Sequence, residues 1–238
     1  MNTAVSTALE HQPNIRLLDV CTGNNLPTGN DRPRTAHRIF HRRDILTYTG
    51  ETFKGVYILR SGSAKSFVTA DNGDEQINCF YYPGDLIGLD GFDNRCHMQN
   101  VQFLETSSVC FVKESEINVL LQTSDDFRRC FLQTMSHALV CESAMIMSLS
   151  TCSSEQRVVQ FILDLSKRFA TQGLSGKEYH LSMTRTDIAN YLGMAIETVS
   201  RIFTNLQVKN IILVKNRQLN ILNYQGLKAL LQAEPCSS

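Results

Sequence analysis

Four polar residues near the C-terminal end of the chain recur at the spacing of one helical face. Glu197, Ser200, Arg201 and Thr204 stand at i, i+3, i+4 and i+7. On a helix they would form an outward stripe about 100° wide. Arginine can donate two hydrogen bonds to guanine N7 and O6, glutamate can accept one from cytosine N4, and serine can serve either way. The stripe therefore has the chemistry to discriminate base pairs along a DNA major groove.

An ordinary solvated helix face is the alternative interpretation of this stripe. Glu197 and Arg201 are also spaced as an i, i+4 ion pair, which stabilises an exposed helix by only about 0.3 kcal/mol and points to no ligand. Charge gives weak support to a polyanionic partner. Residues 153 to 238 carry 10 Lys and Arg against 6 Asp and Glu, whereas residues 1 to 152 carry 13 against 17.

The residues around the stripe predict two helices that would position it. Thr184 or Thr186 can cap a first helix that runs through Tyr191, and Gly193 can form a tight turn. A second helix can then run from Ala195 to Val208, which gives a helix-turn-helix. The apolar residues expected to pack beneath the stripe are Ile196, Val199, Ile202, Phe203 and Leu206, with Ala189 and Leu192 of the first helix.

The segment after the second helix predicts a wing. Residues 211 to 223, IILVKNRQLNILN, read as two β runs that flank a basic turn. Lys215 and Arg217 at this turn could contact phosphates, which fixes register and strength without reading sequence. We assign Thr204, Lys215 and Arg217 to the DNA backbone, and Glu197, Ser200 and Arg201 to the bases.

An apolar heptad pattern lies in the middle of the chain. Its positions step by 3, 4, 3, 4 and 3: Leu132, Met135, Leu139, Glu142, Ile146 and Leu149. This spacing predicts a coiled-coil seam and a homodimer, although a helix that lies on its own β-domain is the alternative. A carboxylate is costly to desolvate, so Glu142 either reaches water or weakens the dimer.

Regular glycines predict a small antiparallel barrel or sandwich before the seam. Gly50, Gly62, Gly73 and Gly84 separate short β-type segments, with clear turn signals at DNGDE (71 to 75) and YPGD (82 to 85). Residues 19 to 37 are rich in Gly, Asn, Pro and Thr, which is typical of a loop.

The whole composition suits a globular protein of the cytoplasm. The chain has 238 residues, 42% of them apolar, and no apolar run near twenty residues, so we expect no membrane segment. The start, MNTAVSTALEHQPN, lacks the pattern of a secretory signal. The eight cysteines show no paired C-x2-C spacing, and we expect them to be mostly reduced, buried thiols.

From about residue 38 to residue 223 the chain resembles the CRP/FNR family of bacterial transcription regulators. The most specific match is ETVSR at 197 to 201, the E-x-x-S-R signature of the FNR and FixK branch; LRSGSAKSF, GDEQI and FLETSSVC support it. The resemblance implies an α+β fold with a cyclic-nucleotide-binding-type β-roll (jelly roll), a long dimerisation helix and a C-terminal winged helix-turn-helix. We place these at 38–122, 123–152 and 153–238, after an irregular N-terminal extension at 1–37.

The resemblance also implies a function and partners. A homodimer would bind double-stranded DNA at a palindrome of TTGAT-like half-sites and act on RNA polymerase, as a transcription activator in oxygen- or redox-linked control. The signal and the target genes are not indicated by the sequence.

The effector region departs from the cyclic-nucleotide-binding members of the family. These carry a G-E-L-G element followed by an Arg-Ser pair that holds the phosphate. Here the loop is GLDGFDNRCHMQN, with Leu89 at the acidic position and Met98 and Gln99 where the Arg-Ser pair is expected. We therefore expect no cyclic nucleotide.

The cysteines match the iron-sulfur members of the family only in part. Cys110, in FLETSSVC, matches the cluster ligand of the β-roll, and Cys21 alone remains of the N-terminal trio. A four-iron cluster normally needs four protein ligands, so we expect none. The alternative is an atypical cluster that recruits Cys79 or Cys96. Without a cluster, control would come from abundance, thiol oxidation or an unidentified ligand.

A metal-dependent β-roll enzyme is the remaining alternative. Such sites need two histidines and a carboxylate that converge inside the barrel. No H-x-D/E element occurs in a strand-like segment, and only His97 is expected near a barrel mouth, where a lone loop histidine is usually solvated. We therefore expect no enzymatic activity.

Overall fold

The structure is a computed structural model that describes residues 36 to 232, with side chains from residue 38 onward. The predicted irregular extension at 1–37 and Cys21 lie outside the described residues, apart from the first backbone positions of one strand. The described residues divide into two compact units, and the boundary in the sequence falls between Leu139 and Val140, inside one helix. Each unit is described by itself.

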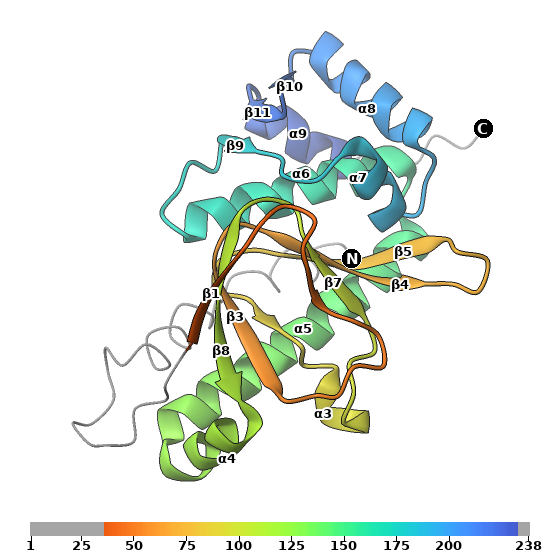
Figure 1. Cartoon of the computed structure of the whole chain (residues 1–238). Helices are drawn as coiled ribbons and strands as arrows, with labels where there is room; N and C mark the ends of the chain where they lie inside the picture. The colour runs from red at the N-terminus through yellow and green to blue at the C-terminus, as the bar shows by residue number, and fades with distance from the viewer. Residues whose placement is uncertain (1–35, 233–238) are drawn as a thin grey trace. The chain divides into compact units, whose positions relative to one another are not determined.

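Two four-stranded antiparallel sheets form the first unit, in the orders β1-β8-β3-β6 and β2-β7-β4-β5 (Figure 1). This confirms the predicted β-roll. Gly62 in the β3–β4 turn has φ +84°, and a Cβ atom there would lie 2.1 Å from the Ser107 hydroxyl oxygen, so only glycine fits. The strands are β1 (Ala36–Phe40), β2 (Ile45–Thr47), β3 (Gly55–Ser61), β4 (Ala64–Thr69), β5 (Glu75–Tyr81), β6 (Leu86–Ile87), β7 (Asn100–Phe103) and β8 (Ser107–Lys113).

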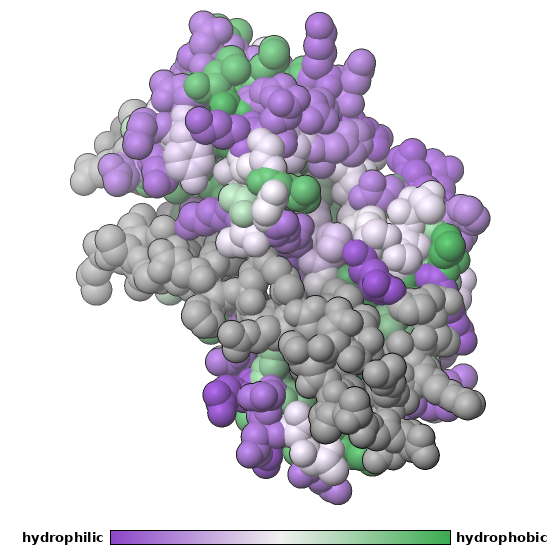
Figure 2. Space-filling view, turned by 90° about the vertical axis from the view of Figure 1, so that its left-hand side faces the viewer, coloured by the Kyte–Doolittle hydropathy of each residue, from purple (hydrophilic) through white to green (hydrophobic). Residues whose placement is uncertain are grey.

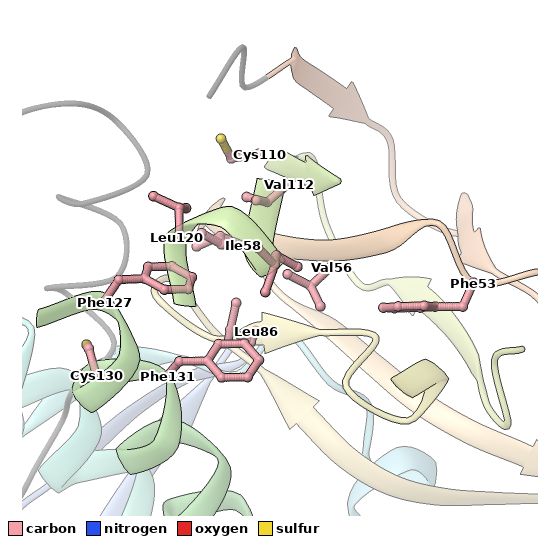
Figure 3. Close-up of a cluster of buried hydrophobic side chains, with 11 residues drawn as sticks. Phe53, Val56, Ile58, Leu86, Cys110, Val112, Leu120, Phe127, Cys130 and Phe131 are labelled. Carbon is pink, nitrogen blue, oxygen red and sulfur yellow. The ribbon is translucent and has the colours of Figure 1, made fainter. Parts of the chain in front are cut away.

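Helices α3 (Gly91–Asn94) and α4 (Glu114–Thr123) accompany these strands, as does α5 (Asp125–Thr151) as far as Leu139. The first turns of α5 close one apolar core of the unit. Figure 3 shows Phe127 and Phe131 of α5 pointing toward Leu86 and Ile58 of the strands. The two rings stack with centroids 5.8 Å apart. Burial of this cluster explains why α5 begins on the roll.

Beyond its first turns, α5 exposes the residues of the predicted seam. The exposed fractions are 58% for Leu132, 64% for Leu139 and 69% for Ile146. Met135, Leu149 and Glu142 are exposed as well. The described surface on the side drawn in Figure 2 is mostly hydrophilic, with apolar areas in separate groups. Within the first unit, Leu132 and Leu139 therefore do not pack into the core of the β-domain.

After the last part of α5, the second unit contains four further helices and three strands among the described residues. They are α6 (Ser154–Thr171), β9 (Glu178–His180), α7 (Arg185–Tyr191), α8 (Ile196–Val208), β10 (Ile212–Lys215), β11 (Gln218–Ile221) and α9 (Tyr224–Gln232). The three strands form one antiparallel sheet in the order β10-β11-β9. Between residues 36 and 232, no helix is both long and apolar enough to cross a bilayer.

A carboxyl group in α6 makes the stability of the second unit depend on pH. Burial raises the pKa of Asp164 to about 6, although hydrogen bonding from Gln160 and the charge of Lys167 oppose the shift. The Gln160 amide donates to Asp164 Oδ1 at 2.7 Å. In the unfolded chain the pKa is about 3.9. The folded state therefore favours the protonated acid. The resulting contribution to the free energy of unfolding is lost as pH rises through about 6.

We expect Asp164→Asn to stabilise the second unit at pH 7.5 by about 1 to 3 kcal/mol, because the folded unit no longer holds a buried charge. The gain should shrink as pH falls from 6 toward 4. Calorimetric unfolding of the full chain at several pH values measures this. Glu178→Gln, at an exposed acid of the same unit, is the control and should show no such trend. A gain that is equal at pH 4.5 and pH 7.5 would contradict the assignment.

Candidate nucleic-acid interface

A short turn, residues 192–195, joins the two helices of the predicted helix-turn-helix, and the first helix is capped at its start. Thr184 is the N-cap of α7, and its hydroxyl accepts a hydrogen bond from the Asp187 N–H at 3.1 Å. Gly193 adopts φ +61° in the turn. The Arg157 guanidinium of α6 donates to the Leu192 carbonyl at 2.7 Å, so the end of α7 is tied to the helix beneath it. The conformation of Gly193 and the Arg157 contact set the direction in which α8 leaves the turn.

The inner face of α8 is apolar and buried. Val199, Ile202, Phe203 and Leu206 are each at most 6% exposed. The Arg185 guanidinium of α7 lies 3.4 Å from the centre of the Phe203 ring, a cation–π contact that holds the two helices together. Burial lowers the pKa of Arg185 to about 10, so this side chain keeps its charge at neutral pH.

The outer face of α8 carries the predicted stripe. Glu197, Ser200, Arg201 and Thr204 are all exposed, on the side opposite the buried residues. The Thr204 hydroxyl donates to the Ser200 carbonyl at 3.0 Å, which fixes the Thr204 side chain along the helix. The structure thus brings the four predicted residues onto one accessible face of α8.

One residue of α8 was placed wrongly by its periodicity. Ile196, predicted to pack beneath the stripe, is 38% exposed. It is the first residue of the helix, so no preceding turn covers it. Sequence reasoning also did not single out Val208, which is 75% exposed at the last position of α8. Their exposure adds apolar surface at both ends of the stripe.

The predicted wing is a two-residue hairpin between β10 and β11. Lys215 pairs with Gln218, and Asn216 and Arg217 form the turn with φ values of 49° and 67°. These positive values are those of a type I′ turn. Lys215, Asn216 and Arg217 are exposed. The Arg217 guanidinium donates to the Ser182 carbonyl at 3.3 Å, so this side chain also braces the turn.

In the first unit, the backbone of the loop that ends in Met98 and Gln99 is hydrogen-bonded to a carboxylate of the chain itself, that of Asp90. The backbone N–H groups of both residues donate to the Asp90 carboxylate, at 2.7 and 3.2 Å. His97, predicted to be solvated, is instead only 3% exposed. Its ring packs edge-on against Phe53, with centroids 5.7 Å apart, because the loop folds back onto the roll.

The described residues do not form a complete ligand set for an iron-sulfur cluster. Cys110 is fully buried in β8, and Cys21 lies outside the described part of the chain. Among residues 36 to 232, no three His, Cys, Asp or Glu side chains are grouped so that they could hold a metal ion. A four-iron cluster needs four protein ligands, and the described thiols do not supply them together.

Comparisons with known proteins agree with this architecture. Residues 37–124 match the model of a cyclic nucleotide-binding domain, and residues 156–230 match that of a Crp-like helix-turn-helix domain.

Two curated relatives and one solved structure illustrate the similarity. The transcriptional activator protein Anr of Pseudomonas protegens is 37% identical over 193 residues, which cover 81% of this chain and 79% of the relative. The anaerobic regulatory protein of Haemophilus influenzae is 36% identical over 186 residues, covering 78% and 72%. The structure of FixK2 from Bradyrhizobium japonicum is 25% identical, with a TM-score of 0.74, and covers 84% of this chain and 99% of that one.

Proposed function

Because the chain belongs to the CRP/FNR family of transcription regulators, in its FNR/FixK-like branch, we propose that it binds a palindromic DNA site as a homodimer and activates transcription. Glu197, Ser200 and Arg201 read base edges, and Thr204, Lys215 and Arg217 contact the backbone. The observation that supports this most directly is the outer face of α8, where four polar residues are exposed opposite a buried apolar face.

The dimer accounts for the palindrome. A two-fold axis would place two copies of α8 about 34 Å apart, which is one turn of B-DNA. The seam of α5 is the surface for this contact: Leu132, Met135, Leu139, Glu142, Ile146 and Leu149. Its apolar members are exposed in the single chain. Their burial against a second copy of the chain would drive dimerisation.

Binding-site selection with the full-length chain tests the proposal. We expect a palindrome whose TTGAT-like half-sites have centres one helical turn apart. A selected pool with no palindrome would contradict a symmetric dimer. The relative named as an anaerobic regulatory protein supports control by oxygen or redox state. DNA binding by anaerobic and air-exposed protein, each with and without a thiol reductant, separates control through thiols from control through abundance.

Activation would require a contact with RNA polymerase. The name of the relative Anr, a transcriptional activator, supports such a contact. Transcription from a promoter that carries the selected site, with purified RNA polymerase, tests it. We propose no cyclic nucleotide as the effector, since the Asp90 carboxylate takes the N–H groups of Met98 and Gln99. We propose no four-iron cluster either, since Cys21 and Cys110 are two matched ligands where four are normally needed.

The wing should contribute phosphate contacts. Because Lys215 is exposed beside the hairpin turn, Lys215→Ala should weaken binding to every sequence alike. A dimer would lose two contacts, so the slope of log K against log salt should flatten by about two units. Salt titrations on specific and unrelated DNA measure this. Lys177→Ala, just outside the far end of the same small sheet, is the control; equal slopes for Lys215→Ala and wild type would exclude the wing.

Glu142 should weaken the dimer. It is exposed in the single chain, and in the proposed seam two copies would face each other across the two-fold axis. The two carboxylates would then repel each other and lose hydration. Glu142→Ala should tighten association by about ten- to a hundredfold, as measured by sedimentation equilibrium at pH 7.

The control is Asp126→Ala, which removes an exposed acid from the same helix outside the seam. Arg128, one alternative partner for Glu142, instead pairs with Asp125. Unchanged or weaker association of Glu142→Ala would show that Glu142 is solvated or paired in the dimer.

A further inference from the structure

Three polar groups from consecutive residues converge on one carboxylate in the first unit. The N–H groups of Met98 and Gln99 donate to the same oxygen of Asp90, at 2.7 and 3.2 Å. The other oxygen lies 3.5 Å from Nδ1 of His97. The three donor residues lie in the loop just before β7, and Asp90 lies just before α3.

Every other backbone group of this loop segment has a different partner. His97 is paired on both sides: its N–H donates to the Glu51 carbonyl at 2.9 Å, and its carbonyl accepts from the Gly50 N–H at 2.8 Å. The Met98 carbonyl accepts from the Thr49 hydroxyl at 3.5 Å, and the Gln99 carbonyl accepts from the Thr47 hydroxyl at 3.4 Å. The two remaining N–H groups therefore depend on Asp90 alone among the described contacts.

The Asp90 side chain is held there as an anion. Its side chain is only 21% exposed. Burial would raise the pKa of this carboxyl, but hydrogen bonds from His97, Met98 and Gln99 outweigh it, and the pKa is lowered below its usual value. Backbone N–H groups that point into one concavity bind carboxylate, phosphate and sulfate in the same manner.

We propose that the N–H groups of Met98 and Gln99, together with the His97 imidazole, form an oxyanion site that the chain fills with its own Asp90 carboxylate. The internal anion keeps the loop ordered without any external ligand. It also keeps free carboxylates and phosphates out of this part of the roll. Once the carboxylate is removed, the site becomes open to a small oxyanion.

Amide NMR of the full-length chain tests this with acetate and inorganic phosphate as probes. In Asp90→Ala we expect the Met98 and Gln99 amides to exchange with solvent about ten- to a hundredfold faster, because charge-assisted hydrogen bonds are lost. Acetate or phosphate should shift these two resonances to saturation and slow their exchange again. Wild type should show neither effect. Asp93→Ala, in α3 itself, is the matched control and should behave as wild type.

The isosteric Asp90→Asn keeps one acceptor but no charge, so its amide exchange should fall between wild type and Asp90→Ala, and it guards against misfolding of the alanine variant. Exchange in Asp90→Asn as slow as in wild type would show that the charge is not used. Absence of saturable shifts in Asp90→Ala would show that the loop binds no oxyanion. Equal binding of acetate by wild type would show that Asp90 does not fill the site. Each of these results would overturn the proposal.

Discussion

Replacing Arg201 with alanine should weaken binding to the specific palindrome by about 2 to 6 kcal/mol, because each of the two half-sites loses a bidentate contact of about 1 to 3 kcal/mol. The residue is exposed at the centre of the stripe on α8, one turn after Glu197. Binding to unrelated DNA should change little, since that depends mainly on phosphate contacts. The loss in binding free energy cannot exceed the difference between binding to the specific palindrome and binding to unrelated DNA. Titrations with both DNAs at one salt concentration measure the difference.

Arg201→Lys is the matched control, because it keeps the charge but lacks the planar fork that fits guanine. We expect it to retain non-specific affinity and salt dependence while it loses preference at the same base pair. Site selection with Arg201→Ala should show relaxed preference at that position only. The same preferred half-site as wild type would mean that Arg201 and Glu197 form an ordinary solvated ion pair.

Ile146→Glu should dissociate the dimer. Ile146 is 69% exposed in the single chain, so the fold should tolerate the change, whereas the interface would lose two buried isoleucines and gain two carboxylates. The lost burial alone amounts to about 3 to 6 kcal/mol per dimer, and desolvation of the carboxylates adds to it. Sedimentation equilibrium should show association at least about a hundredfold weaker, and occupancy of the palindrome should fall with it.

Gln133→Glu places the same charge on an exposed position of the same helix, about 140° around from Ile146. It should leave association unchanged. A dimer of normal strength with Ile146→Glu would mean that the chain associates through another surface. An unfolded Ile146→Glu variant would show instead that Ile146 contributes to the fold of the single chain, which its exposure argues against.

Local patterns predicted most of the elements, because their causes lie within a few residues. Strands β3 to β5 lie between the turn glycines, and the Thr184 cap lies three residues from Asp187, which it holds. Strand β9 has only three residues and exists because it pairs with β11, about forty positions later. No local pattern signals that pairing.

The misplaced side chains have the same kind of cause. His97 is buried because its loop returns to Gly50 and Glu51, far away in the chain, and periodicity does not report such contacts. Ile196 is exposed because the helix starts there, which its 3.6-residue period cannot show. The roles of the stripe, the wing and the seam stay predictions, since their tests need DNA and a second copy of the chain.

Arg217 holds a backbone conformation that glycine would adopt without steric strain. Its φ of 67° is that of the second turn residue of a type I′ hairpin, and a side chain there costs about 1 to 2 kcal/mol. Arg217→Gly also loses the hydrogen bond to the Ser182 carbonyl, which is long at 3.3 Å and so contributes less than the strain. The substitution should therefore raise the melting temperature even as it removes a guanidinium from the hairpin tip. Under the proposed function, a search for heat-resistant variants and a search for tight DNA binders would select opposite residues at this position. The first search alone would yield a more stable protein that binds its DNA site less tightly.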